Sequence, residues 1–562
     1  MQTFQIIFSY LPYAIAILWL IRSTKIILFY LYLWQLKEYH LGRFLTHFRT
    51  EKGKILLVNN LTVIKILFIA YFFLFPFLVS YALYYPGSLY YLIAYYVFPA
   101  FLIILYAAES LKAIFDFISG KAKIPSSTKK TLFFVLLFLA LPALLLVYLF
   151  NLKEELNSFS FWLLLIDLYL PVIVSAMVLS FQPFTVFLRW LTIQRAKTKR
   201  EQFKDLLVIG ITGSYGKTST KEFLYTILSQ KFNVLKTKSH QNSEIGVSQC
   251  ILKELTPDRQ IFIAEMGAYG RGGIKLLCSI AKPKVGILTG VNEQHLALFG
   301  SQKNIIKAKY ELIESLPESG LAIFNGDNKF CVDLYRKTNI AKRIVTSKPE
   351  GLDFLPDIWA EGIIMHKNYI TLDACTSEKC IKVKAYLSGI HFIPGLLSAI
   401  LLAEELGMTS EEISEAILKI HSLDRTMNIF EGVAGLTIID DTYSANPEGV
   451  FAALDYIKNY RAKKIIIMPS LIELGKAAKE THQKIGQKIS EICDMVIVTT
   501  KDHFQEIGEE FIRGGGNEQK ALYTEDPKEI INILREFCDP GDIVLLEGRV
   551  PNALMDYLVP QV

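Results

Sequence analysis

Cysteine is scarce in this sequence, and its spacing excludes one class of site. The 562 residues include seven cysteines, the first of which is Cys250. None belongs to a C-x-x-C pair or to a Cys/His cluster with the spacing of a metal site, so no zinc module is expected. We expect all of the cysteines to be reduced and unpaired in a cytosolic compartment.

Charge is sparse as well. Charged residues make up 20% of the chain and the net charge is +6, with no basic stripe and no recognisable nucleic-acid module, so nucleic acid is not an expected partner. Hydrophobic residues make up 52% and the mean hydropathy is +0.32, which is too apolar for a wholly soluble protein of about three to four domains. The apolar excess is concentrated in the first third of the chain.

That first third contains runs long enough to cross a bilayer core of about 30 Å. We expect five transmembrane helices, and they lie near residues 4–21, 62–84, 88–108, 131–151 and 161–183. The aromatic stretch that continues to Trp34 either lies along the membrane interface or extends the first helix. A cleaved signal peptide is a weaker alternative, because no basic segment precedes the first run and no small-residue cleavage site follows it.

The loops predict the orientation. The segments 37–54, 112–130 and 189–200 are rich in lysine and arginine, whereas 85–88 carries no charge and 151–160 has one lysine against two glutamates. Positive loops stay in the cytosol, so the N-terminus is predicted outside and the rest of the chain inside, in the plasma membrane of a bacterium. Glu109 and Asp167 lie at or inside the spans and mark either a polar substrate path or helix ends.

After the spans, residues 206–222 read L-L-V-I-G-I-T-G-S-Y-G-K-T-S-T-K-E, an apolar strand followed by a glycine-rich turn and a helix. Such a turn brings backbone N–H groups close to an anion. Lys217 supplies a positive charge for the terminal phosphates, and the hydroxyl of Thr218 is placed to bind magnesium. The strict pattern G-x-x-x-x-G-K-[ST] is not met, because Ile211 stands at the first glycine position and Gly210 precedes it.

Further strand-like runs at 261–265 and 284–289 alternate with helical segments and predict a parallel α/β sheet. Ligands bind such sheets at the carboxyl ends of the strands. Glu265 ends one strand and is therefore well placed to hold magnesium beside the phosphate loop.

The loop, read as G-x-T-G-x-x-G-K-T-[ST], resembles the ATP loop of the Mur ligase family, the amide-forming enzymes of peptidoglycan precursor synthesis. The resemblance extends from Leu207 to the end of the chain. It implies that ATP is bound by the loop residues Gly213, Ser214, Tyr215, Gly216, Lys217, Thr218 and Ser219.

Four further strings in the central part resemble family motifs. Q-N-S-E-I-G at 241–246 implies a phosphate contact from Asn242, and E-M-G-A at 265–268 resembles the acidic magnesium motif that contains Glu265. V-N-E-Q-H-L-A-L-F-G-S at 291–301 implies that His295 assists a second magnesium, although a lone histidine would more often be structural. I-F-N-G-D-N at 323–328 implies that Asn325 and Asp327 lie near the nucleotide.

A-K-Y-E-L at 308–312 resembles a family motif whose lysine is often carbamoylated, which converts a cation into a carboxylate able to hold magnesium. Lys309 is the candidate. Taken alone, a lysine on a charged helix would face solvent.

The C-terminal part carries two further resemblances. Arg425 in L-D-R-T-M matches a family arginine that reaches the γ-phosphate from a second domain. L-T-I-I-D-D-T-Y-S-A-N-P at 436–447 resembles D-D-[ST]-Y-[NSA]-A-N-P, which implies that Asp441, Tyr443 and Asn446 face the nucleotide and the incoming amine. Without the resemblance, D-D-x-Y would be a surface turn.

Four positions depart from the family pattern. The chain has Gly272-Gly273-Ile274 where Gly-Glu-Ile is usual, and 391–396 reads H-F-I-P-G-L where H-N-V-x-N-A is usual near the adenine. Pro469-Ser470-Leu471 replaces Gly-Asp-Met, and Glu547-Gly548-Arg549 stands where K-G-S is usual. Because the last two border the acceptor pocket of the relatives, the amine here can differ from D-alanyl-D-alanine.

The predicted architecture is multidomain: a helical transmembrane domain (1–190), an α/β P-loop Mur ligase central domain (205–420) and an α/β Rossmann-like C-terminal domain (421–562). The resemblance implies transfer of the ATP γ-phosphoryl group to a substrate carboxylate, followed by attack of an amine on the acyl phosphate. The implied product is a muramyl peptide or related cell-wall precursor extended by a D-Ala-D-Ala-like dipeptide or an amino acid at the cytosolic membrane face.

Two questions stay open at this point. Five spans replace the family's usual N-terminal domain for the uridine nucleotide, so the acceptor is either lipid-linked or a soluble precursor used by an anchored enzyme. The alternative function is a membrane-anchored nucleotide-binding regulator or scaffold without ligase activity, which the missing Gly-Glu and asparagine elements favour.

Overall fold

A computed structural model describes residues 2–37, 39, 41–48, 51–57, 59–71, 98–151, 156–238, 241–443 and 445–559. The chain forms two compact units, Met1–Phe187 and Leu188–Val562. We call them the helical unit and the α/β unit and describe each by itself.

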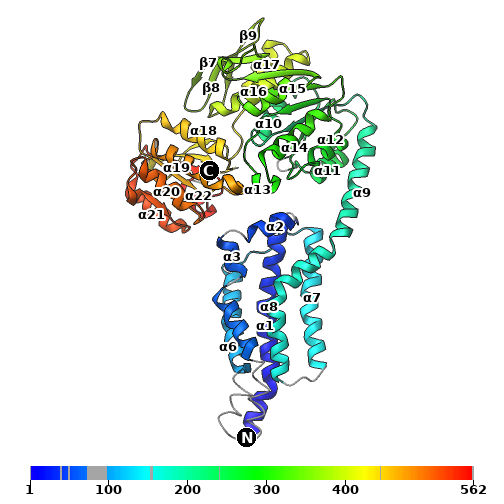
Figure 1. Ribbon diagram of the computed structural model, residues 1–562, viewed down its shortest axis with the longest axis vertical. Coiled ribbons are helices and arrows are strands. Elements are labelled where there is room, and N and C mark those ends of the chain that lie inside the picture. Colours follow the sequence, from blue (N-terminus) through cyan, green and yellow to red (C-terminus); the bar gives the residue numbers. More distant parts are fainter. Residues whose placement is uncertain are drawn as a thin grey trace. The chain divides into compact units, whose positions relative to one another are not determined.

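The helical unit is a bundle of long helices (Figure 1). Its labelled helices are α1 (Gln2–Leu36), α2 (Leu41–His47), α3 (Glu51–Leu57), α6 (Phe98–Ile118), α7 (Lys129–Asn151) and α8 (Leu156–Ser180), and residues 60–71 are also helical. Helix α9 (Gln182–Glu201) continues the chain into the α/β unit.

Four helical stretches among the described residues are long and apolar enough to cross a membrane. They are Tyr10–Leu36, Gly53–Tyr71, Lys130–Asn151 and Leu156–Glu201. The predicted spans 62–84 and 88–108 fall partly on residues 72–97, which lie outside the described residues. The number of spans therefore stays a prediction.

The aromatic stretch that ends at Trp34 extends the first helix, as one of the two expectations had it. Helix α1 runs unbroken from Gln2 to Leu36, and Trp34 is fully buried, stacked on Phe44 with ring centroids 3.9 Å apart. Because the helix is unbroken, the stretch does not form a separate segment, which was the other expectation.

Two apolar clusters hold the helical unit together. One surrounds Trp19, Phe98 and Tyr106, and the other surrounds Trp34 and Phe134. Arg22 lies on α1 between the two tryptophans and is buried. A polar layer thus separates the two clusters along α1.

The α/β unit contains two sheets. The nine-stranded sheet has the order β2-β3-β1-β4-β5-β6-β7-β8-β9 and the six-stranded sheet the order β10-β11-β15-β12-β13-β14. We call each sheet and the helices packed on it the nine-stranded lobe and the six-stranded lobe; Figure 1 shows the first in green to yellow and the second in orange to red.

The strands of the nine-stranded lobe are β1 (Leu207–Thr212), β2 (Val234–Lys236), β3 (Ile261–Glu265), β4 (Val285–Leu288), β5 (Leu321–Asn325), β6 (Ala341–Thr346), β7 (Ile358–Met365), β8 (Ile370–Cys375) and β9 (Cys380–Ala385). Its helices are α10 (Lys217–Leu228), α11 (Glu244–Glu254), α12 (Gly273–Ala281), α13 (Leu296–Phe299), α14 (Gln302–Glu314), α15 (Lys329–Lys337), α16 (Ile393–Glu405) and α17 (Ser410–Ile417). Strands β2 to β7 and β1 pair in parallel, as predicted, whereas β8 and β9 are antiparallel additions at the edge.

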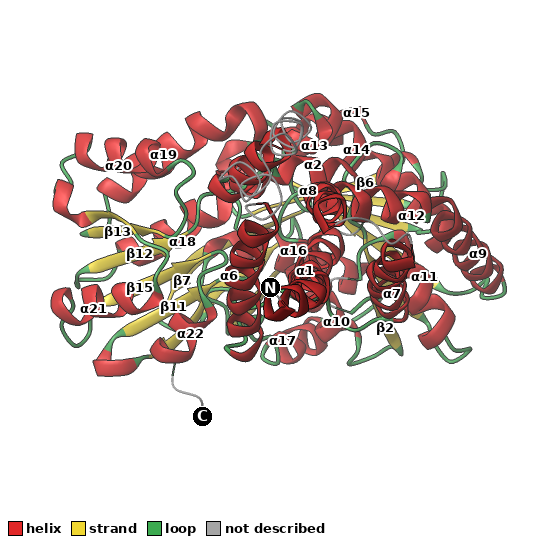
Figure 2. Ribbon diagram, turned by 90° about the horizontal axis from the view of Figure 1, so that it is seen from below, coloured by secondary structure: helices red, strands yellow, loops and turns green. Residues whose placement is uncertain are grey.

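The strands of the six-stranded lobe are β10 (Asn428–Glu431), β11 (Thr437–Asp441), β12 (Lys464–Met468), β13 (Met495–Val498), β14 (Ala521–Tyr523) and β15 (Ile543–Glu547). Its helices are α18 (Pro447–Lys458), α19 (Ala478–Ser490), α20 (Phe504–Arg513), α21 (Pro527–Phe537) and α22 (Asn552–Leu558). Only β10 is antiparallel to its neighbour, and Figure 2 shows β11, β12, β13 and β15 side by side.

Both sheets are covered on two faces, which is why their central strands are apolar almost throughout. Strand β1 illustrates this: Ile209 and Ile211 pack into one cluster of buried side chains and Val208 into another, and all three are fully buried. Parallel pairing brings the ends of neighbouring strands to one edge, where Ile211 lies opposite Glu265.

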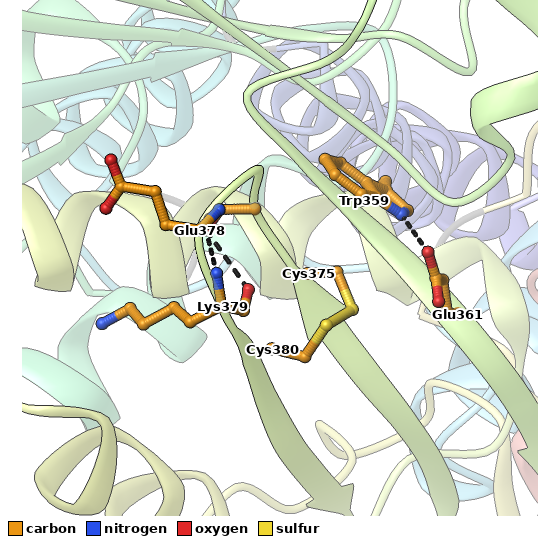
Figure 3. Close-up of a disulfide and its surroundings, with 7 residues drawn as sticks. Trp359, Glu361, Cys375, Glu378, Lys379 and Cys380 are labelled. Carbon is orange, nitrogen blue, oxygen red and sulfur yellow. Dashed lines mark hydrogen bonds between the residues drawn. A yellow bond between two sulfur atoms is a disulfide. The ribbon is translucent and has the colours of Figure 1, made fainter.

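The expectation that all cysteines are unpaired is wrong for two of the seven. Cys375 at the end of β8 and Cys380 at the start of β9 form a disulfide, with their Cα atoms 4.0 Å apart (Figure 3). The two cysteines lie directly opposite each other in the antiparallel ladder. Their spacing in the sequence did not reveal this pairing, because it depends on the hairpin that β8 and β9 form. Cys250, Cys278, Cys331, Cys493 and Cys538 are free.

Candidate active site

A cavity of about 370 Å³ in the α/β unit is lined by residues of both lobes. Thirteen of the residues singled out from the sequence line it: Ser214, Tyr215, Gly216, Lys217, Thr218, Ser219, Asn242, Glu265, His295, Asn325, Asp441, Tyr443 and Asn446. Gly213, Lys309 and Arg425 were expected there too but do not line it. The structure therefore brings most of the predicted set into one place.

The phosphate loop depends on two glycines. Gly213 has φ +156°, and a Cβ there would lie 2.1 Å from Oγ1 of Thr289; Gly216 has φ +74° and directly precedes α10. Both conformations favour glycine. The ammonium of Lys217, in the first turn of α10, donates to the carbonyl of Gly213 at 2.7 Å. The Lys217 side chain thus lies against the backbone of the phosphate loop.

Glu265 is the hub of the polar side chains below the loop. It is buried and accepts hydrogen bonds from Thr218 Oγ1, Lys221 Nζ and Asn242 Nδ2, each at 3.1 Å. Burial pushes the pKa of Glu265 upward, but Lys221 and Lys217 outweigh it and hold the pKa below its usual value. Glu265 is therefore an anion at neutral pH.

These groups fit a magnesium ion that is only partly bound by protein. The hydroxyl of Thr218 and the carboxylate of Glu265 are the hard oxygen donors that magnesium prefers, and magnesium keeps waters and substrate phosphates as its other ligands. Among the described residues there is no group of three or more His, Cys, Asp or Glu side chains that could hold a metal by itself. The donor set thus suits a metal that arrives with a nucleotide.

His295 joins the two lobes. It precedes α13 with φ +67°, and its Nδ1 lies 2.5 Å from Oε2 of Glu473, which belongs to the six-stranded lobe. Burial lowers the pKa of His295, and Glu473 opposes this shift. A histidine whose one nitrogen is bound to a carboxylate has the arrangement typical of a metal-binding imidazole, with Nε2 as the ligand atom.

Lys309, on α14, is buried and lies outside the lining of the cavity. The expectation for a lone lysine, exposure to solvent, is wrong. Burial and the charge of Lys217 lower the pKa of Lys309 to about 7, against the influence of Glu311. The lowered pKa favours the neutral amine, which is the form that can react with carbon dioxide.

Asn325 and Asp327 follow β5, and only the first lines the cavity. Asn325 donates to the carbonyl of Thr289 at 2.8 Å and accepts from the amide of Asp327 at 2.9 Å, so it fixes the turn beside the phosphate loop. The carboxylate of Asp327 instead binds the hydroxyl of Thr346 at 2.6 Å and the amide of Ser347 at 2.8 Å. Asp327 is thus occupied by the end of β6.

In the six-stranded lobe, Asn446 caps α18 by accepting from the amide of Gly449 at 3.1 Å. The amide of Tyr443 donates to the carbonyl of Arg425 at 2.8 Å. The Arg425 side chain is exposed, whereas its neighbours Leu423 and Thr426 line the cavity. A contact between its guanidinium and a nucleotide therefore requires that side chain to turn inward.

Asp441 and Glu547 form a buried carboxyl pair. They end β11 and β15 and lie opposite each other in the ladder, and Glu547 is fully buried. Burial raises the pKa of Asp441 to about 7 and, with the nearby Asp441 charge, raises the pKa of Glu547 well above its usual value. Two adjacent carboxyl groups cannot both ionise cheaply, so at least one holds a proton near neutral pH.

Several lining residues were not predicted as site residues. They include Phe223, Tyr269, Phe392, Pro394, Glu448 and Arg549. Phe392 and Pro394 belong to the string at 391–396 that departs from the family pattern. The resemblance of this string to the family's adenine motif was the sequence signal that could have identified them as lining residues. Glu448 follows the N-P of the 436–447 string and bonds Asn292 of the other lobe.

Comparison with known proteins agrees with this geometry. Residues 211–403 match the Mur ligase middle domain and residues 425–550 match the Mur ligase, glutamate ligase domain. A UDP-N-acetylmuramoyl-tripeptide--D-alanyl-D-alanine ligase of Synechocystis is 31% identical over 351 residues, which cover 62% of this chain and 73% of the relative. The enzyme of the same name from Bacillus subtilis is 25% identical over 345 residues, covering 61% and 72%.

Solved structures give the same picture. MurF from Acinetobacter baumannii superposes with a TM-score of 0.58 at 25% identity, over 66% of this chain and 79% of that chain. MurF ligase from Thermotoga maritima in complex with ADP superposes with a TM-score of 0.56 at 25% identity, over 65% and 81%. Along the sequence, the helical unit takes the place of the family's usual UDP-binding domain. The chain belongs to the Mur ligase family and is an ATP-dependent ligase of that type.

Proposed function

We propose that the protein is a multi-pass ligase of the bacterial plasma membrane that couples a muramyl-peptide-like acceptor to an amino acid or to a D-Ala-D-Ala-like dipeptide. The observation that carries the proposal is that Lys217, Glu265 and His295 of one lobe line the same cavity as Asp441 and Tyr443 of the other. The relatives whose names specify a muramyl tripeptide and D-alanyl-D-alanine support the substrate class. Domains at 1–190, 205–420 and 421–562 are part of the proposal.

The reaction begins with the nucleotide. The loop amides from Gly213 to Ser219 hold its phosphates, Lys217 leaves the Gly213 carbonyl to neutralise the transferred group, and Asn242 and Asn325 border the phosphates. A magnesium ion, when bound at Thr218 and Glu265, offsets phosphate charge that would otherwise repel an attacking carboxylate. Lys217 and Arg425 do the same from the two lobes as charge builds up in the transition state.

The acceptor carboxylate attacks the γ-phosphorus, which gives an acyl phosphate and ADP. The amine then attacks the acyl carbon, an amide forms and phosphate leaves. Asp441, Tyr443 and Asn446 are the proposed contacts of the incoming amine, and their place on the six-stranded side of the cavity supports this role. His295 and a carbamoylated Lys309 are the proposed supports of a second magnesium, and the bond from Glu473 keeps the His295 ring oriented.

We also propose that the helical unit crosses the membrane with the N-terminus outside, because the basic segments 37–54 and 112–130 then both face the cytosol. Four helices of sufficient length and hydropathy among the described residues support the crossing of the membrane, and the proposed orientation requires the five spans of the charge pattern. A membrane unit in place of a nucleotide-sugar domain favours a lipid-linked acceptor over a soluble one.

The central test measures ADP release by the purified full-length protein. We expect release to require both an acceptor and an amine, and the Lys217→Ala variant to lose at least about a hundredfold in kcat/KM, because a charge that stabilises the transition state is removed. Lys253→Ala, which alters an exposed lysine on α11, is the matched control and should keep full activity. Mass spectrometry of the product across a panel of amino acids and D-Ala-D-Ala identifies the amine.

UDP-linked and lipid-linked muramyl peptides are compared in the same assay. Rapid turnover of the UDP form alone would rule out the lipid-linked acceptor and leave a membrane anchor. ADP release that ignores acceptor and amine would contradict ligation and favour the nucleotide-binding regulator.

Lys309 gives a second test. Lys309→Ala should abolish ligation because the carbamate carboxylate is lost, and added formate or acetate should restore part of the activity by replacing that carboxylate. Lys307→Ala, on the exposed side of the same helix, should behave as wild type. Labelling with ¹³C-bicarbonate should give a carbamate signal by NMR that is absent from Lys309→Ala; full activity without this signal would refute carbamoylation.

The carboxyl pair predicts a pH dependence of stability. The folded protein holds the Asp441 proton up to about pH 7, whereas the unfolded chain releases it near pH 4, so unfolding becomes easier as the pH rises through this window. Glu547→Gln removes one buried acid and should raise Tm by a few degrees at pH 8 and by less at pH 5. Glu536→Gln, at an exposed position, should change neither value; equal shifts of Glu547→Gln at both pH values would disprove the repulsion.

The orientation can be tested with cysteines, since the first native cysteine is Cys250. A membrane-impermeant maleimide applied to intact cells should label Ser88→Cys, in the uncharged segment, and should label Ser127→Cys only after the cells are permeabilised. The reverse pattern would mean that the N-terminus lies in the cytosol.

A further inference from the structure

The helical unit contains a cavity of about 560 Å³ that the ligase reaction does not use. Helices α1, α6 and α8, residues 56–65 and the segment 121–123 line it. Its wall combines charged and apolar side chains. We distinguish two parts of it: a layer of buried, paired charges and a more open part near residues 116–123.

The buried layer consists of Arg22, Lys65, Glu109 and Asp167. Arg22 contacts Glu109 at 2.6 Å and also pairs with Asp167, and Lys65 contacts Glu109 at 2.8 Å and Asp167 at 3.0 Å. No side chain of the four is more than 16% exposed. Each carboxylate contacts both cations, so the layer is neutral. The pairing is what allows four charged side chains to be buried among apolar helices.

The open part is not neutral. Lys25 pairs with Asp116 at 2.5 Å, but Lys121 and Lys123 form no ion pair with a carboxylate among the residues that the structure describes. Because the other charges on the cavity wall cancel in pairs, these two lysines leave it with a net charge of about +2. Both are exposed and lie in the basic segment that the charge pattern assigns to the cytosolic side.

An apolar flank adjoins the two lysines. Ile26 and Phe29 of α1 and Tyr169 and Val172 of α8 belong to the same cavity wall. Tyr169 is 53% exposed and Val172 is 61% exposed, so this side of the cavity is open to the surroundings of the helices. Within α8, Pro171 has no N–H group, so the carbonyl of Asp167 lacks its helical donor beside the cavity.

We propose that this cavity binds the phosphate or diphosphate head group of a long-chain lipid. A doubly charged anion matches the excess of two positive charges, and the apolar flank receives the first part of the chain. The proposal rests on the proposed function in one respect, the position of the helices in a bilayer, and it specifies the class of lipid that would carry the acceptor. Lys121 and Lys123 contact the head group, and the neutral layer of paired charges forms another part of the cavity wall.

Binding can be measured on the full-length protein in neutral detergent with farnesyl diphosphate as the probe. We expect saturable binding, about fivefold weaker in Lys121→Gln or Lys123→Gln and about thirtyfold weaker in the double variant, as expected for two lysines near a membrane surface. Lys112→Gln removes a charge from the same segment but not from the cavity wall, and should change binding less than twofold. Both lysines are exposed, so these variants should fold, which unchanged ATP binding would verify.

Other probes separate the sources of the ligand. Farnesol tests the chain alone, inorganic diphosphate the head group alone, and phosphatidylglycerol an ordinary singly charged lipid. Each should bind at least tenfold more weakly than farnesyl diphosphate. Equal binding of inorganic diphosphate would overturn the lipid assignment, equal binding of phosphatidylglycerol would overturn the preference for a doubly charged head group, and unaffected binding by the double variant would overturn the site.

The outcome is independent of ligation. Acceptor-dependent ADP release together with no farnesyl diphosphate binding would overturn this inference and leave the ligase intact. Lysine-dependent lipid binding without ADP release would do the opposite.

Discussion

The ligase site depends on one buried carboxylate. Glu265 accepts hydrogen bonds from the first turn of α10 through Thr218, from the second through Lys221, and from the segment before α11 through Asn242. A buried anion is tolerated only when it is paired and hydrogen-bonded. Moving any of the three partners away from Glu265 would therefore cost free energy. The hub therefore orients the helix whose N-terminus faces the phosphates. The ammonium of Lys217 is not hydrogen-bonded to Glu265 but to the carbonyl of Gly213. Lys217 can therefore leave this carbonyl and bind a nucleotide phosphate without breaking a contact of Glu265.

The two lobes meet through polar contacts at the rim of the cavity. His295 binds Glu473, Asn292 binds Glu448, and the amide of Ala297 donates to the carbonyl of Glu473 at 3.0 Å. Each pair takes one member from either lobe. Buried apolar side chains of both lobes also belong to one cluster, which contains Phe392 of the nine-stranded lobe and Val450 and Leu454 of the six-stranded lobe. The polar pairs thus lie at the rim of the cavity beside an apolar contact between the lobes.

Sequence reasoning predicted a parallel α/β sheet, the phosphate loop and Glu265 because each depends on local signals: an apolar strand, glycines at fixed spacing and an acid at a strand end. It failed where the answer depends on a partner distant in sequence. Whether Lys309 is buried depends on the packing of α14 against the sheet. The Cys375–Cys380 disulfide depends on the hairpin register, and the pairing of Asp441 with Glu547 depends on β11 lying next to β15. Arg425 could be assigned a role by resemblance, but the direction of its side chain could not.

Two of the four departures from the family pattern can be related to contacts in the structure. Gly272-Gly273 lacks the usual glutamate, yet Glu311 on α14 accepts from the amides of Gly272 at 2.6 Å and Lys275 at 3.0 Å and so caps α12. A carboxylate thus still lies at the start of this helix, supplied from another element. Glu547 is the opposite case, because an acid stands beside Asp441 where a lysine is usual, and the pair must hold a proton that a lysine would make unnecessary.

The same rule governs the helical unit. Four charged side chains inside long apolar helices cost free energy unless every one is paired, and each of Arg22, Lys65, Glu109 and Asp167 has two partners of opposite sign. Because these partners come from α1, residues 60–71, α6 and α8, the rotation of each element about its axis is fixed by the others. Lys25 lies three residues beyond Arg22 on α1, close to one turn of helix, so its direction follows from that of Arg22. The neutral layer that fixes the helices therefore also determines where Lys25 meets Asp116, at the edge of the more open part of the cavity.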